Sequence, residues 1–298
     1  MKHIFLLGPT ASGKTTTAIK LARHLNTSII SADSRQIYKE LNIGTAKPTL
    51  EELSQIKHHF INSHNLDQNF SAGQFGEQAL KIISGAKKPM IICGGTNFYI
   101  HVLLYGLDNI PEIPSEVRDN LNDKLNSKGI KFLQGELKLK DPISFETIDI
   151  NNPHRIIRAL EVYEYTGNAL SSYQLNSDKK MLIPNLLIGL KTERDVLYER
   201  INDRVDKMFS DGLLEEVRSL KDYSDKQALQ TVGYKELFEH FNGSYDLEEA
   251  KRLIKRNTRR YAKRQLTWLK RYKKIQWFDH DAKSNQIIEF IDNRLSLS

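Results

Sequence analysis

A glycine-rich loop near the N-terminus constrains the fold of this chain more than any other feature. Residues 5–22 read "FLLGPTASGKTTTAIKLA" and contain the pattern G-x-x-x-x-G-K-[ST]. The two glycines let backbone N–H groups point at an anion, and a helix over 14–25 would add the positive end of its dipole. Lys14 supplies a cation, and Thr15 a hydroxyl that can bind magnesium. The loop predicts a phosphate site, but it does not name the molecule that carries the phosphate.

Short apolar runs alternate with helical segments along the rest of the chain. The runs "HIFLL", "TSIISAD", "MIIC", "NLLIGL" and "KIQWFDH" read as strands. This alternation predicts an α/β fold, a P-loop NTPase-like core with a parallel sheet flanked by helices. Ligands in such sheets lie beyond the carboxyl ends of the strands. We therefore expect Gly8–Thr15, Asp33 and Gly94–Thr96 to lie along one edge.

A central segment differs in character from this core. It opens with two prolines in "IPEIPSEVRDNL", continues into charged helical patterns, and contains no convincing strand between 111 and 181. The sequence predicts a small all-helical insertion domain over 112–182. Residues 1–111 and 183–298 would then form the α/β core, ending in a basic C-terminal helix.

The positive charge of the chain is concentrated in one segment. The net charge is +7, yet residues 250–275 hold twelve lysines and arginines and no acid, while the remainder holds 32 basic and 37 acidic residues. The basic side chains recur every four residues, which places them along one helical face, whereas Ala250 and Ile254 lie on another. Such a face suits a phosphodiester backbone. A merely solvated face, or a calmodulin-type or acidic membrane target, is the alternative.

Asp33 is the first candidate for a catalytic group. An ordinary P-loop NTPase places an aspartate after an apolar strand to hold magnesium, but here "MIIC" is followed by Gly94-Gly95-Thr96, and the acid follows "IIS" instead. Asp33 could act as a general base. It could equally be, with Ser34, the N-cap of a helix over "RQIYKEL".

Composition bounds the compartment. The single cysteine, Cys93, lies in an apolar run, which favours a buried residue in a reducing compartment. The N-terminal apolar run is too short for a signal peptide, and no window approaches the length of a membrane span. We expect a cytoplasmic protein without a membrane segment.

Five motifs in fixed order make the chain recognisable. They are "GPTASGKT", "SADSRQIY", "GGTNFY", "HRIIRALEVYE" and "TVGYKEL" with "RNTRRYAKRQLTWLKR". This series closely resembles the tRNA dimethylallyltransferases, also called tRNA isopentenyltransferases, in their short bacterial form.

The resemblance implies a reaction. Dimethylallyl diphosphate would be the donor, held by the P-loop with Mg²⁺, and the acceptor would be N6 of the adenosine 3′-adjacent to the anticodon in a subset of tRNAs. The base would be flipped into the enzyme, and diphosphate would be released. Loops of this kind are often described as nucleotide-binding or ATP-binding, but an ATP requirement does not follow from the loop. Nothing in the sequence demands more than a monomer.

The resemblance also implies roles for particular residues. Asp33 would be the general base, with Lys14 and Thr10 as further catalytic residues and Thr15 as the metal ligand. The donor diphosphate would be bound by Gly8, Pro9, Thr10, Ala11, Ser12, Gly13, Lys14, Thr15, Arg200 and Arg204. The tRNA would be bound by Asp33, Ser34, Arg35, Gln36, Thr96, Arg118, His154, Arg155, Ile156, Ile157, Arg158, Arg256, Arg260, Lys263 and Arg264.

Three other functions remain to be weighed against this one. A P-loop metabolite kinase would use the same loop but needs neither a basic helix nor a helical insertion. An adenylate isopentenyltransferase prenylates a free nucleotide, and a small acceptor needs neither the basic segment nor "HRIIRALE". A protein that only binds RNA would leave Lys14 and Asp33 without a task.

Overall fold

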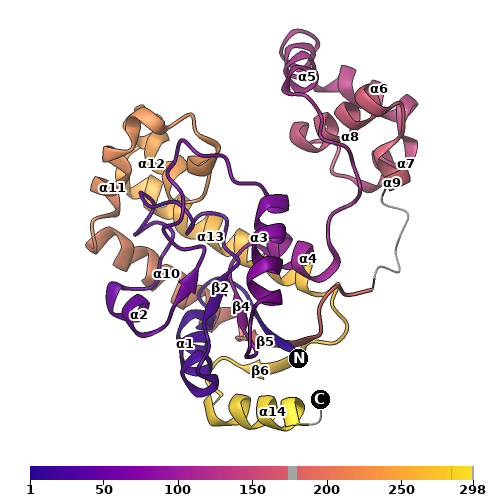
Figure 1. Cartoon of the computed structure of the whole chain (residues 1–298). Helices are drawn as coiled ribbons and strands as arrows, with labels where there is room; N and C mark the ends of the chain where they lie inside the picture. Colours follow the sequence, from indigo (N-terminus) through magenta and orange to yellow (C-terminus); the bar gives the residue numbers. More distant parts are fainter. Residues whose placement is uncertain (174–179, 283, 297–298) are drawn as a thin grey trace. The chain divides into compact units, whose positions relative to one another are not determined.

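The computed structural model describes residues 1–173, 180–282 and 284–296, and its chain divides into two compact units (Figure 1). The first unit combines Met1–Leu104 with Met181–Ser298, and the second is Tyr105–Lys180.

The second unit begins before the proline-rich stretch that set the expected boundary at 112. Ile110 and Ile113 pack against its hydrophobic core, so the chain joins this unit ahead of the prolines. Residues 174–179 of the expected insertion lie outside the described part of the chain.

The described part of the first unit is built on a six-stranded parallel sheet with the order β3-β2-β4-β1-β5-β6. The strands are β1 (His3–Leu7), β2 (Ile29–Ser31), β3 (His58–His59), β4 (Ile91–Cys93), β5 (Asn185–Lys191) and β6 (Gln276–Asp279). The parallel α/β core predicted from the sequence is confirmed, and β3 is the strand that the sequence did not reveal. Because β2, β4 and β1 are neighbours, the loops that follow them meet at one edge.

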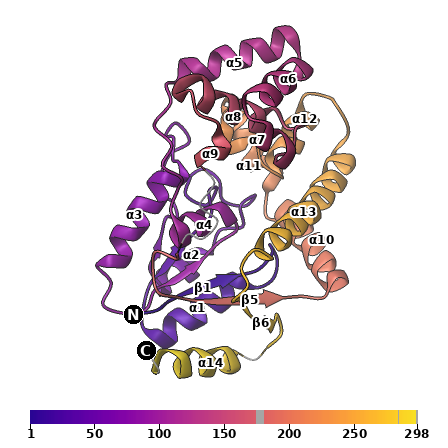
Figure 2. The same cartoon turned by 90° about the vertical axis from the view of Figure 1, so that its right-hand side faces the viewer.

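Helices cover both faces of the sheet. Ile4 and Leu6 of β1 pack in one hydrophobic cluster with residues of α1 (Lys14–Leu25) and α14 (Ser284–Ser296). Phe5 alternates to the opposite face and is equally buried. That face carries α3 (Ala72–Ser84) and α4 (Asn97–Tyr105), and Figures 1 and 2 show α4 and α1 on opposite sides of the sheet.

The remaining helices of the first unit surround the carboxyl edge of the sheet. They are α2 (Leu50–Gln55), α10 (Arg194–Ser210), α11 (Leu213–Ser219), α12 (Tyr234–Phe241) and α13 (Leu247–Leu269), with short 3-10 turns at Lys221–Tyr223 and Gln227–Leu229. Helix α13 begins at the side chain of Asp246, which accepts a hydrogen bond from Glu249 N (2.8 Å). Its buried stripe includes Ala250 and Ile254, as the sequence predicted.

The regular elements in the described part of the second unit are all helices. The unit contains α5 (Ser115–Lys128), α6 (Ile130–Lys140), α7 (Pro142–Thr147), α8 (Pro153–Thr166) and α9 (Leu170–Tyr173). Leu121, Leu133 and Leu160 form its core. Asp141 is buried and accepts hydrogen bonds from the backbone N–H groups and hydroxyls of Ser144 and Ser171, which ties α7 to α9.

No helix among the described residues is long and apolar enough to cross a membrane.

Candidate active site

The P-loop lies between β1 and α1, as predicted, and its lysine is folded back onto it. Lys14 Nζ donates to the carbonyls of Gly8 (2.9 Å) and Pro9 (2.6 Å), and its side chain is buried. Burial lowers the pKa of Lys14 to about 8. The ammonium therefore has little water to hydrate it, and an anion entering the loop would gain a strong partner.

The loop forms one wall of a cavity of about 650 Å³ within the first unit. Its lining includes most of the sequence-predicted residues of this unit, namely Thr10–Thr15, Asp33–Gln36, Thr96, Arg200 and Arg204. Three strand ends that are far apart in the chain therefore converge, because β2, β4 and β1 are adjacent. The volume lies in the usual range of small-molecule sites.

Asp33 follows β2, and its two carboxylate oxygens have different surroundings. Oδ1 accepts hydrogen bonds from Arg35 N (2.9 Å) and Gln36 N (3.3 Å) and so caps a turn at residues 34–37. No helix starts here. The alternative that Asp33 caps a helix over residues 35–41 was therefore wrong, although Asp33 does cap a turn. Oδ2 has no hydrogen-bond partner among the described residues, which leaves it free to accept a proton.

Two glycines after β4 make room for Asp33 and for the backbone before it. A Cβ on Gly94 would lie 2.2 Å from the backbone of Ala32, and a Cβ on Gly95 would lie 2.8 Å from Asp33 Oδ2. An aspartate at the strand end, where an ordinary P-loop NTPase has one, could not fit. The preceding residue, Cys93, is buried, as predicted, and burial raises its pKa to about 11.

Cations dominate the cavity wall. Among its lining residues, all of which the structure describes, Asp33 is the one carboxylate, whereas Lys14, Arg200 and Arg204 all lie near the loop. A Cβ on Gly13 would meet Arg200 Nη2 at 3.6 Å, which places that guanidinium beside the loop. Burial lowers the pKa of Arg204, and Asp33 opposes the shift. This charge pattern favours a compact polyanion beside the P-loop.

Thr96 and Gln36 hold the Asp33 turn in place. Thr96 Oγ1 accepts from Ser34 N (2.9 Å) and donates to Ser34 Oγ (3.1 Å). The Gln36 amide donates to the carbonyls of Thr45 (3.1 Å) and Ala46 (3.3 Å) and accepts from the Ser31 hydroxyl. The Gln36 side chain is thus engaged within the protein, and its role in tRNA binding stays a prediction.

Sequence reasoning missed the contribution of α13 to the site. Gln265 is buried; its Oε1 accepts from Thr10 N (2.7 Å), and its Nε2 donates to Gly95 O (2.8 Å). Tyr261 donates its hydroxyl to Gly95 O (2.7 Å) and lines the cavity. The only sequence signal was that these residues interrupt the basic pattern of the helix.

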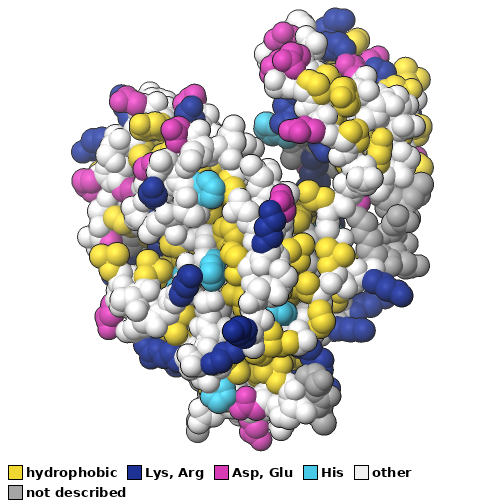
Figure 3. All heavy atoms as spheres, viewed as in Figure 1, with side chains coloured by type: hydrophobic (Ala, Val, Ile, Leu, Met, Phe, Trp, Pro, Cys, Tyr) yellow, Lys and Arg dark blue, Asp and Glu magenta, His cyan; other side chains and the backbone are white. Residues whose placement is uncertain are grey.

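The basic side chains of α13 lie outside the cavity lining, and several are already paired. Lys251 and Lys255 form ion pairs with Asp206 of α10, and Arg252 with Glu249. The exposed Arg260, Lys263 and Arg264 have no ion pair within the described part of the chain, and Arg256 is half-buried beside Asn257. On the face drawn in Figure 3, lysines and arginines are scattered among other side chains.

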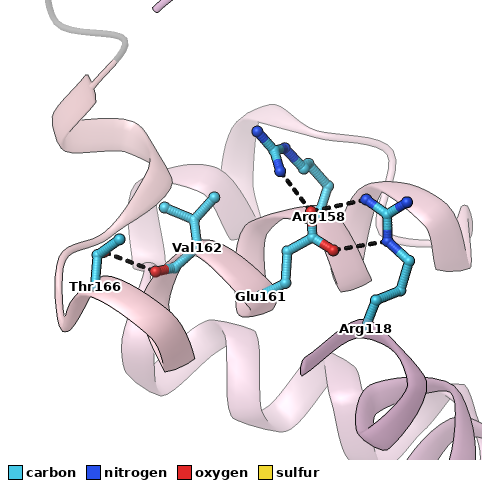
Figure 4. Close-up of polar contacts among 5 residues, drawn as sticks. All are labelled: Arg118, Arg158, Glu161, Val162 and Thr166. Atoms are coloured by element: carbon cyan, nitrogen blue, oxygen red, sulfur yellow. Dashed lines mark hydrogen bonds and ion pairs between the residues drawn. The ribbon is translucent and has the colours of Figure 1, made fainter. Parts of the chain in front are cut away.

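In the second unit, two predicted tRNA-binding arginines share one buried acid (Figure 4). Arg118 Nε and Nη2 both donate to the Glu161 carboxylate at 2.8 Å, and Arg158 Nη1 donates to it at 2.5 Å. The Glu161 side chain is 2% exposed, whereas those of Arg118 and Arg158 are 56% and 43% exposed. Burial opposes the ionisation of Glu161, but the two arginines outweigh it and hold its pKa below the ordinary value.

Two of the predicted tRNA contacts on α8 are core residues. Ile156 and Ile157 are buried in the hydrophobic cluster of the second unit, so their side chains do not face solvent. His154 and Arg155 are exposed, and the side chain of Asn152 caps the helix by accepting from His154 N (3.1 Å).

The donor set for a metal is sparse. The described residues contain no group of three or more histidine, cysteine, aspartate or glutamate side chains that could hold a metal ion. Thr15 lines the cavity at the start of α1. A single hydroxyl fits Mg²⁺ that is bound mainly through substrate phosphates and water, which is how Mg²⁺ usually binds.

Comparison with known proteins identifies the family. The model of the IPP transferase family matches residues 36–272. This chain belongs to that family. It is 45% identical to a tRNA dimethylallyltransferase of Christiangramia forsetii and 43% identical to one of Cytophaga hutchinsonii, each over 98% of this chain and at least 97% of the relative.

Solved structures agree with this assignment. The full-length tRNA isopentenylpyrophosphate transferase of Bacillus halodurans is 38% identical, with a TM-score of 0.72 over 99% of this chain and 95% of its own. A eukaryotic dimethylallyltransferase, described as acting on tRNA, has a TM-score of 0.80 at 27% identity, over 98% of this chain and 80% of its own. Membership of the IPP transferase family favours a prenyltransferase over a metabolite kinase.

Proposed function

We propose that this protein transfers the dimethylallyl group of dimethylallyl diphosphate to N6 of the adenosine 3′-adjacent to the anticodon in a subset of tRNAs. The proposal rests on family membership and on one observation: the P-loop, the cations Lys14, Arg200 and Arg204, and a single carboxylate, one oxygen of which has no hydrogen-bond partner in the described part of the chain, line the same cavity. We place the reaction in the cytoplasm and expect the enzyme to act as a monomer.

The proposed reaction assigns the leaving group to the loop. The N6 atom attacks C1 of the dimethylallyl group, a C–N bond forms, and the C1–O bond breaks with its electron pair going to diphosphate. Lys14, Arg200 and Arg204 would stabilise the charge that develops on the diphosphate. Thr10, whose backbone is held by Gln265, would offer its hydroxyl to the same group. Magnesium, bound through Thr15 and the phosphates, would neutralise part of that charge.

Asp33 would accept the proton that N6 must lose. Its Oδ1 is used by two backbone N–H groups, which fix the carboxylate, while Oδ2 stays available in the cavity. A positioned carboxylate of this kind is a suitable general base. The proton then passes to solvent, and the protein returns to its starting state.

The test is a direct transfer assay. The protein is incubated with an unmodified tRNA transcript, Mg²⁺ and dimethylallyl diphosphate, without ATP. Mass spectrometry should show one added dimethylallyl group on the adenosine next to the anticodon. Absence of product, together with ATP-dependent phosphorylation of a small acceptor, would replace the proposal with a kinase.

A further inference from the structure

An irregular loop over residues 42–46 forms one wall of the cavity, to which it contributes Gly44, Thr45 and Ala46. Residues 42–46 belong to no strand or helix themselves, so side chains from other elements help to fix their position. Lys47 fixes its end, because Nζ donates to the side-chain oxygens of Asn42 (3.1 Å) and Asn62 (2.6 Å).

One acidic side chain holds the wall from outside. Glu216 of α11 accepts hydrogen bonds from the N–H groups of three consecutive loop residues: Asn42 (3.1 Å) and Ile43 (2.7 Å) on Oε2, and Gly44 (3.0 Å) on Oε1. A fourth bond comes from the Tyr234 hydroxyl (2.7 Å), also on Oε1. A carboxylate with four donors is a strong, directional anchor for a loop.

Tyr234 also packs closely against the wall. Tyr234 is fully buried, and a Cβ on Gly44 would lie 2.6 and 2.7 Å from two of its ring carbons and 2.8 Å from its hydroxyl oxygen. Burial, reinforced by Glu216, raises the pKa of the Tyr234 hydroxyl, so it remains a donor. The Tyr234 ring therefore packs against Gly44, whose N–H donates to the Glu216 carboxylate.

The side chain of Gln36 connects the wall held by Glu216 to Asp33, the proposed general base. Gln36 donates its amide hydrogens to the carbonyls of Thr45 and Ala46, and its own backbone N–H donates to Asp33 Oδ1. Displacement of the wall would remove the acceptors of Gln36 and loosen the turn that orients Asp33. Among the described residues, no hydrogen bond or ion pair joins Glu216 to the P-loop.

We propose that Glu216 is a positioning residue, which with Tyr234 sets the wall over residues 42–46 and, through Gln36, the orientation of Asp33. The proposal deepens the proposed function and rests on it: the wall would seat the acceptor base, not the donor diphosphate. Loss of Glu216 should therefore slow transfer while sparing diphosphate binding.

The test compares two neighbouring substitutions. In Glu216→Gln, the amide oxygen can serve Asn42 and Ile43, but the NH₂ group then faces the N–H of Gly44, which loses its acceptor. We expect single-turnover transfer to fall at least tenfold, hydrogen exchange over residues 42–46 to accelerate, and affinity for inorganic diphosphate to stay within twofold. Glu215→Gln, on the exposed side of the same helix, should match the wild type in all three.

Tyr234→Phe provides a milder second variant, because it removes one of the four bonds and keeps the ring. A two- to fivefold slower transfer is expected. The proposal is overturned if Glu216→Gln transfers within twofold of the wild type, if exchange over residues 42–46 is unchanged, or if diphosphate affinity falls in parallel. If the wild type itself transfers nothing, the proposed function fails, while the exchange comparison still decides whether Glu216 holds the wall.

Discussion

Removal of both arginines from Glu161 should destabilise the second unit strongly and in a pH-dependent way. The Glu161 carboxylate is 2% exposed, and its three charge-assisted hydrogen bonds come from Arg118 and Arg158. Arg158→Ala leaves Arg118 as the bidentate partner of Glu161 and should lower the free energy of unfolding of the second unit by about 1 kcal/mol. Arg118→Ala should lower it by about 2 kcal/mol. The double substitution leaves a buried charge without a cation, which costs about 3–5 kcal/mol. The combined loss should thus equal or exceed the sum of the single losses.

The sign of the pH dependence follows from the same contacts. In the wild type the folded pKa of Glu161 lies below the unfolded value, so its contribution is present above the unfolded pKa and is lost as pH falls through the folded pKa. In the double variant only burial acts, which raises the folded pKa above the unfolded one. The variant should therefore recover stability on acidification from pH 7.5 to 5, a range in which the wild-type contribution of Glu161 stays constant.

Hydrogen exchange followed by mass spectrometry on the full chain measures the stability of the helices of the second unit at each pH. The control is Lys128→Ala with Lys138→Ala, which removes two exposed cations from α5 and α6 and should change stability by less than about 1 kcal/mol in total. If the double arginine variant lost less than 1 kcal/mol, or lost the same amount at both pH values, the carboxylate would not depend on its partners.

Three further predictions concern the proposed reaction. Relative to Lys14→Arg, diphosphate affinity should fall as pH rises above 8, because burial lowers the pKa of Lys14 to about 8 and the neutral amine binds an anion poorly; calorimetry in two buffers should show more proton uptake above pH 8 in the wild type than in Lys14→Arg. Asp33→Asn should keep tRNA and diphosphate binding but transfer roughly 10²–10⁴-fold more slowly, and full activity would remove Asp33 from the mechanism. The triple substitution of Arg260, Lys263 and Arg264 by alanine should reduce the salt slope of tRNA binding by about 2; an unchanged slope would mean that this face is only solvated.

The core of the site could be predicted because its parts are local in sequence. The strand, loop and helix around Lys14 follow one another along the chain, and strand ends in a parallel sheet must meet at one edge. Asp33 was therefore found together with the loop. The two-residue strand β3 was not, because it is too short to show a periodic pattern.

The contacts that position these groups could not be predicted. Gln265 bonds to Thr10 across 255 residues of sequence, and Glu216 reaches Gly44 across 172. Nothing in the local pattern of either helix indicates such a partner. Burial could not be predicted either: Ile156 stands in a motif that we assigned to tRNA binding, and its helix turns this apolar side chain into the core.

The buried thiol at the end of β4 has a practical use. Cys93 is the only cysteine in the chain, is 8% exposed, and has a pKa of about 11, so almost none of it is the reactive thiolate at neutral pH. A maleimide dye should therefore leave the native protein unlabelled. Cysteine pairs engineered at solvent-facing positions, one in each unit, would then carry donor and acceptor fluorophores without any need to mutate the native residue. Single-molecule energy transfer could thus follow the spacing of the two units as tRNA is added.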